Sequence, residues 1–126
     1  VHNNCVLVEI CKGMYGLPQA GIIANTHLVQ HLGTHGYQAC THTPGLFCHA
    51  TRPVTFDLVV DDFGIKYEGQ DHVDHLLAAL HECYSITTDA SSTKYCGLTL
   101  EWDYLSSPPT VDVSMPGYVA HALHHF

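Results

Sequence analysis

The chain contains little positive charge. Its 126 residues include 4 lysines and arginines against 12 aspartates and glutamates, a formal net charge of -8 with neutral histidines. Proteins that bind nucleic acid by themselves usually carry a basic stripe that releases counterions from phosphate. The composition therefore argues against autonomous nucleic-acid binding by this chain.

The sequence also lacks paired cysteine motifs and long apolar runs. Its six cysteines, at positions 5, 11, 40, 48, 83 and 96, form no C-x-x-C pair, so they indicate neither a zinc ribbon nor a thioredoxin-like pair. Several of them fall inside apolar runs, where reduced, buried thiols are usual, and an intracellular compartment is expected. No signal peptide is visible, and no apolar run approaches the roughly 20 residues of a spanning helix, so we expect no membrane partner.

Several catalytic motifs are absent. The sequence has no Gly-rich phosphate loop, no G-x-S-x-G and no H-E-x-x-H, which counts against several classes of small-molecule enzyme and against zinc proteases. It has no internal repeat or low-complexity tract, and its length suits one domain at most. It begins at Val1 in mid-pattern without an initiator Met, so we expect it to be a piece of a longer protein.

The most informative stretch is residues 58–67, LVVDDFGIKY. Apolar, β-branched residues precede two adjacent carboxylates and a second apolar run follows, which predicts a β-hairpin with Asp61 and Asp62 at or beside its tip. Neighbouring strand residues point to opposite faces, so both acids reach one cation only where the chain bends. A plain tight turn, which Asp favours, is the alternative interpretation.

Periodicity predicts an α+β fold: a small antiparallel sheet with two helices packed on one face, plus a second small hairpin. The first helix is expected to bury a face that includes Ile23, Leu28 and Leu32, and Asp71 is expected to cap the second. The predicted elements, in order, are strand 6–11, helix 20–35 ended by Gly36, extended pieces 37–40 and 46–49, hairpin arms 55–60 and 63–67, helix 71–84, strands 85–88, 95–104 and 110–115, and helix 118–126.

Histidines are unusually numerous, with twelve in the chain. His27, His31 and His35 recur every four residues of the first predicted helix, so their imidazoles could share a metal ion. Structural or solvated histidines are the favoured interpretation, because no Glu or Cys completes the set in the sequence pattern.

Three segments carry a family resemblance. Residues 12–21, KGMYGLPQAG, resemble the YGL-x-QA segment of reverse transcriptases of copia-type LTR retrotransposons. Residues 59–62, VVDD, match the Y-x-D-D hairpin of these enzymes, and residues 94–102, KYCGLTLEW, resemble the later primer-grip hairpin. The motifs occur in the right order and span roughly residues 7–104.

The resemblance implies an RNA-directed DNA polymerase palm that performs two-metal nucleotidyl transfer. Asp61 and Asp62 would be the catalytic, metal-binding carboxylates for two Mg²⁺ ions, with Asp62 the weaker or supporting ligand. Expected partners in the intact protein are an RNA or DNA primer-template and deoxynucleoside triphosphates. The expected location is the cytoplasm, a virus-like particle or the nucleus.

The resemblance also implies binding residues on both sides of the acids. Pro18, Gln19 and Gly21 would lie against the incoming nucleotide. The primer end would be contacted by residues of the later hairpin, namely Tyr95, Gly97 and Trp102.

Two departures from the family pattern limit the expected activity. The family's first catalytic Asp lies upstream of the YGL-x-QA segment, before this chain starts, and Val59 stands where the family has Tyr. We therefore expect residues 1–126 to be a partial palm domain, without fingers or thumb and inactive alone. A non-catalytic scaffold or interaction module derived from a palm, and a His/Cys metal-binding module, remain as alternatives.

Overall fold

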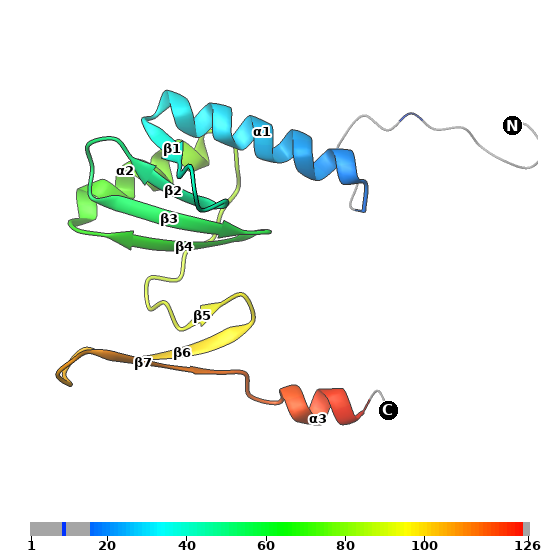
Figure 1. The fold of residues 1–126 in the computed structure, drawn as a ribbon, viewed down its shortest axis with the longest axis vertical. Helices are drawn as coiled ribbons and strands as arrows, with labels where there is room; N and C mark the ends of the chain where they lie inside the picture. Colours follow the sequence, from blue (N-terminus) through cyan, green and yellow to red (C-terminus); the bar gives the residue numbers. More distant parts are fainter. Residues whose placement is uncertain (1–8, 10–15, 125–126) are drawn as a thin grey trace, which may run out of the picture.

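A computed structural model describes Glu9 and residues 16–124, and it has the predicted α+β architecture. Strands β1 to β4 form one antiparallel sheet in chain order, and β5 to β7 form a second (Figure 1). The helices are α1 (Pro18–Thr34), α2 (Gln70–His81) and α3 (Tyr118–Leu123). The strands are β1 (Tyr37–Ala39), β2 (Leu46–His49), β3 (Val54–Val59), β4 (Asp62–Tyr67), β5 (Lys94–Tyr95), β6 (Leu98–Asp103) and β7 (Thr110–Ser114).

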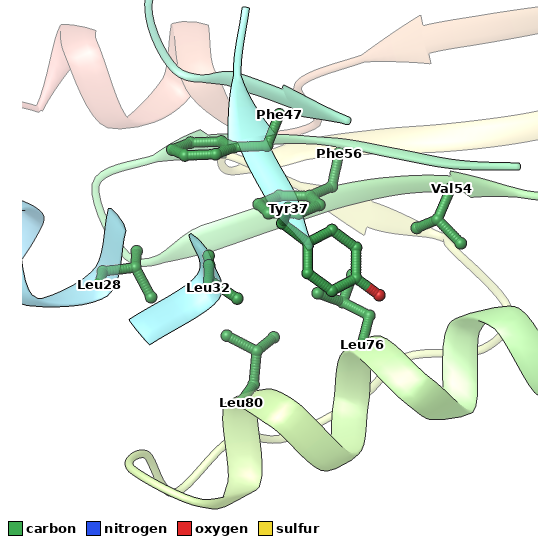
Figure 2. Packing of buried hydrophobic residues seen from close by; sticks show 8 residues of the cluster. All are labelled: Leu28, Leu32, Tyr37, Phe47, Val54, Phe56, Leu76 and Leu80. Atoms are coloured by element: carbon green, nitrogen blue, oxygen red, sulfur yellow. The ribbon is translucent and has the colours of Figure 1, made fainter. Parts of the chain in front are cut away.

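The core lies between one face of the four-stranded sheet and helices α1 and α2. Figure 2 shows leucines of both helices directed at aromatic side chains from the strands. Phe47 and Phe56 face each other across β2 and β3 and stack with ring centroids 5.0 Å apart. Burial of such rings supplies most of the favourable free energy of a small domain. The fully enclosed part of the core consists of Leu32, Tyr37, Val54, Phe56, Leu76 and Leu80.

Helix α1 begins at Pro18, two residues before the predicted start, and is ended by Gly36 as predicted. Pro18 occupies the first helical position, where its missing N–H costs nothing. Gly36 follows the helix with a φ of 87°, a left-handed conformation that glycine adopts without strain. Only the second half of the helix packs on the sheet, because Leu28 and Leu32 are buried whereas Ile23 is 56% exposed. The predicted burial of Ile23 is therefore wrong.

Two other predicted features are absent from the described residues. Asp71 is not the N-cap of α2, because the helix begins one residue earlier and Gly69 occupies the cap position. Residues 85–88 have no strand partner and run as an irregular connection after α2. A short β-branched run predicts a strand only where a neighbouring edge is available to pair with it.

The predicted strand 95–104 is a hairpin rather than one strand. Cys96 and Gly97 both have positive φ, 49° and 78°, which reverses the chain between β5 and β6. The predicted second hairpin thus becomes a three-stranded sheet. The strand predicted at 6–11 lies, except for Glu9, outside the described residues.

The two sheets are joined by a hydrogen bond from the side chain of Tyr95 to that of Asp57. The Tyr95 hydroxyl donates to Asp57 Oδ2 at 2.5 Å, linking β5 to β3. Asp57 pairs with Gly64 on β4, and a Cβ atom at Gly64 would collide with Asp57 Oδ1 and lie 3.3 Å from the Tyr95 ring. Gly64 therefore leaves the space that this contact occupies.

The described residues contain no candidate for a membrane-spanning helix. None of the helices there is both long and apolar enough to cross a bilayer.

We expect Gly64→Ala to loosen the second sheet. The added methyl group must displace Asp57 or Tyr95, at a cost of about 1–3 kcal/mol. Faster amide hydrogen exchange in β5 and β6, together with a lower urea midpoint, measures this effect. Gly33→Ala is the matched control, because a Cβ atom at Gly33 meets nothing within 4 Å. Equal exchange rates in the two variants would contradict the role of Gly64.

Candidate functional site

The tip of the β3–β4 hairpin is a two-residue turn, Val60–Asp61. Val59 pairs with Asp62, and the ladder continues without a break to Val54 and Tyr67. Val60 has a φ of 56°, which is an outlier for a β-branched residue. Such strained residues persist only where the surrounding structure holds them, and they concentrate at functional sites.

Asp61 borders a large cleft between the hairpin tip and the start of α1. The cleft has a volume of about 980 Å³, which lies within the range of small-molecule binding sites. Leu28, Leu58 and Phe63 give it an apolar lining, and Tyr84 and Ile86 contribute from the segment after α2. The remaining lining residues are Gly16, Leu17, Ala20, Gly21, Ala24, Asn25, Val60, Leu80 and Ser85.

Asp62 borders a different, smaller hollow of about 410 Å³. Strand alternation explains the difference, because Asp62 pairs with Val59 on the sheet face opposite to Phe56 and Leu58. That face lies toward the second sheet. The hollow is completed by Lys94, Tyr95, Cys96, Gly97, Thr99 and Pro116. The two acids, both exposed and adjacent in the chain, thus lie between two hollows.

The three residues predicted to bind nucleotide are close in sequence but differ in position. Gly21 lines the large cleft. Pro18 and Gln19 form the exposed first turn of α1 and are not among the residues that line it. The structure therefore brings the loop region and Asp61 to the same cleft through Gly16, Leu17 and Gly21.

The three residues predicted to contact the primer are also divided. Tyr95 and Gly97 line the smaller hollow with Asp62. Trp102 lies farther along β6, where its ring stacks on Tyr104 and its Nε1 donates to the carbonyl of Ser92 at 2.9 Å. Trp102 is not among the residues that line either hollow.

Tyr95 is held in its neutral form. Two causes raise the pKa of the Tyr95 phenol far above its ordinary value: burial is the larger, and the hydrogen bond to Asp57 is the second. The neutral hydroxyl can therefore keep donating to the carboxylate over the whole physiological pH range.

Sequence reasoning missed Asp57, Gly64 and Lys94. Asp57 is an acid between Phe56 and Leu58 within a strand, and alternation directs it away from the helices. This position was a signal that something polar covers the opposite sheet face. Gly64 and Lys94 gave no comparable signal, because their roles depend on contacts between segments far apart in sequence.

Comparison with curated proteins shows similarity to a transposon protein. The chain is 29% identical over 118 residues to a Saccharomyces cerevisiae protein named "Putative transposon Ty5-1 protein". The match covers 90% of this chain and 37% of that protein, so the chain spans little more than a third of its length. No family model matches the chain, and no solved structure matches it.

Proposed function

We propose that the chain is part of the palm of a retrotransposon RNA-directed DNA polymerase, with Asp61 and Asp62 as the carboxylates of nucleotidyl transfer. The similarity to a protein named as a transposon product supports the origin. The three ordered sequence motifs support the enzyme class. Activity, substrates and partners belong in this proposal to the whole protein.

The observation that carries the proposal is the position of the acids between two hollows. Asp61 faces the cleft at the start of α1, and Asp62 faces the hollow at the β5–β6 turn. A polymerase must bring the triphosphate and the primer hydroxyl together beside its carboxylates, so that one side takes the nucleotide and the other the primer end. The cleft at Asp61 has room for a nucleotide, and the β5–β6 turn is the segment that resembles a primer grip.

The donor set fits Mg²⁺. Asp61 lies in the two-residue turn, Asp62 is the first residue of β4, and both are exposed, so a hard cation can reach carboxylate oxygens while keeping several of its waters. When bound, Mg²⁺ would activate the primer hydroxyl and stabilise the leaving pyrophosphate. In this proposal Asp61 and Asp62 hold the ions, and Gly21 leaves the cleft wall open beside the nucleotide.

The acidic balance of the chain favours a second candidate, a non-catalytic module derived from a palm. A net charge of -8 opposes phosphate binding unless basic surface is supplied elsewhere in the whole protein. Titration with Mg²⁺-deoxynucleotide distinguishes the two. Binding at the cleft supports the polymerase, whereas cooperative folding without binding supports the module.

We expect Asp61→Asn to abolish DNA synthesis by the whole protein encoded by the reading frame that contains this chain. Losing one metal-binding charge should cost about 3–4 kcal/mol of transition-state stabilisation, a decrease of roughly 10²–10³-fold in rate. Primer extension measures this effect. Asp112→Asn, an exposed acid on β7, is the matched control. Primer extension that survives Asp61→Asn at the control rate would refute the assignment.

We expect Gln19→Ala to impair mainly nucleotide use. If Gln19 contacts the incoming sugar, its loss should raise the KM for deoxynucleotides more than it lowers the rate at saturation. Steady-state primer extension at varied nucleotide concentration measures both. Gln30→Ala, an exposed glutamine farther along α1, should leave both unchanged. Wild-type kinetics in Gln19→Ala would exclude Gln19 from the nucleotide site.

A further inference from the structure

Five partly buried histidines lie near the ends of α1 and α2 or on the adjoining strand β2, and they differ in what their rings contact. His49, His72 and His75 already have ring nitrogens engaged by neighbours. His49 accepts from the amides of Thr51 and Arg52, His72 lies 3.1 Å from the Arg52 guanidinium, and His75 lies 3.0 Å from the Tyr37 hydroxyl. These contacts give the three rings a structural role.

His31 and His35 are different, because they face an acid and a thiol from the end of α2. His31 lies in the last turn of α1 and His35 is its C-cap, with ring centroids separated by 4.9 Å. His35 Nε2 is 3.1 Å from Glu82 Oε2, and His31 Nδ1 is 3.6 Å from Cys83 Sγ. The sequence pattern had no Glu or Cys to complete the histidine set. The fold supplies both from residues about fifty positions away.

We propose a zinc site between the ends of α1 and α2, made by four side chains: His31, His35, Glu82 and Cys83. This inference does not depend on the proposed polymerase function. Within the described part of the chain, one ligand atom from each of His31, His35 and Glu82 lies within 4.8 Å of the others.

The spacing of the ligand atoms suits a tetrahedral ion. Zn–N and Zn–O bonds of 2.0–2.1 Å place two such ligands about 3.3 Å apart, and a Zn–S bond of 2.3 Å places sulfur about 3.5 Å from nitrogen. The observed separations of 3.1 Å for the His35–Glu82 pair and 3.6 Å for the His31–Cys83 pair are close to these edges. His31, His35 and Glu82 form the mutually close part of the set, and the exposed Cys83 and Glu82 side chains must turn toward His31 Nδ1 to bring all four atoms around one ion.

A backbone contact orients the His31 ring for metal binding. His31 Nε2 lies 2.6 Å from the carbonyl of Ala79, which can only accept, so Nε2 carries the proton and Nδ1 keeps its lone pair. Metal-binding histidines commonly donate their second ring N–H to a carbonyl in this way. The lone pair of His31 thus points to the side on which Cys83 lies.

The electrostatic surroundings also favour a cation. The carboxyl ends of α1 and α2 converge here, and each helix carries partial negative charge at that end. Glu82 adds a full charge. His31 and His35 are only partly exposed, whereas Glu82 and Cys83 are accessible to an incoming ion.

The ligand set selects zinc over the hard cations proposed for Asp61 and Asp62. A thiolate with imidazoles prefers Zn²⁺ to Mg²⁺ or Ca²⁺. On binding, the Cys83 thiol proton is released to solvent, and the ring proton of His35 moves from Nε2, which now donates to Glu82, to Nδ1, so that Nε2 can bind the ion. Because residues 84–86 follow Cys83 directly and line the large cleft, the ion would also restrain one wall of that cleft.

The test is metal binding by the purified 126-residue chain after removal of metal with chelator. We expect one equivalent of Zn²⁺ to bind and to raise the unfolding temperature, reversibly with EDTA. Co²⁺ as a probe should give the d–d bands of a four-coordinate site and a thiolate charge-transfer band. Failure to take up either metal would overturn the proposal.

Variants assign the ligands. His35→Ala and Glu82→Gln should weaken Zn²⁺ binding at least tenfold, and Cys83→Ser should remove the Co²⁺ charge-transfer band. The matched controls are His27→Ala, Glu68→Gln and Cys48→Ser, each an exposed residue outside the site. Binding that survives His35→Ala and Glu82→Gln, or a charge-transfer band lost in Cys48→Ser, would place the ion elsewhere and refute the assignment.

Discussion

The two-residue turn between β3 and β4 is the constraint on which the candidate site depends. A turn this short leaves no freedom of register, so the pairing of Val59 with Asp62 fixes the face of every residue in the hairpin. The same turn holds Val60 in a conformation that β-branched residues avoid. As a result, Asp61 projects from the tip toward α1, whereas Asp62 borders the second sheet.

The second constraint is the contact that joins the two sheets. Asp57 accepts the Tyr95 hydroxyl through space that Gly64 leaves free. This contact brings the β5–β6 turn beside Asp62 and so creates the smaller hollow. The buried leucines of α1 and α2, by contrast, pack on the four-stranded sheet. The position of the β5–β6 turn, which is proposed to contact the primer, therefore depends on the contact between Tyr95 and Asp57.

Features set by local chemistry could be predicted from the sequence. The hairpin tip, the end of α1 at Gly36 and the α+β class all follow from turn residues and periodicity. Features that require partners distant in sequence could not be predicted. The β5–β6 reversal depends on Cys96 adopting a left-handed conformation, and the histidines of α1 find Glu82 and Cys83 only through the fold.

The assignment of Asp61 and Asp62 to a cation site is tested most directly by locating a bound divalent cation near the hairpin tip. Mn²⁺, a paramagnetic substitute for Mg²⁺, broadens the amide resonances of residues close to it in NMR spectra of the chain. We predict broadening across residues 59–63 that disappears in Asp61→Asn and persists in Asp112→Asn. Sharp resonances at 59–63 throughout a titration with Mn²⁺ and deoxynucleotide would contradict the assignment of these acids to a catalytic cation site.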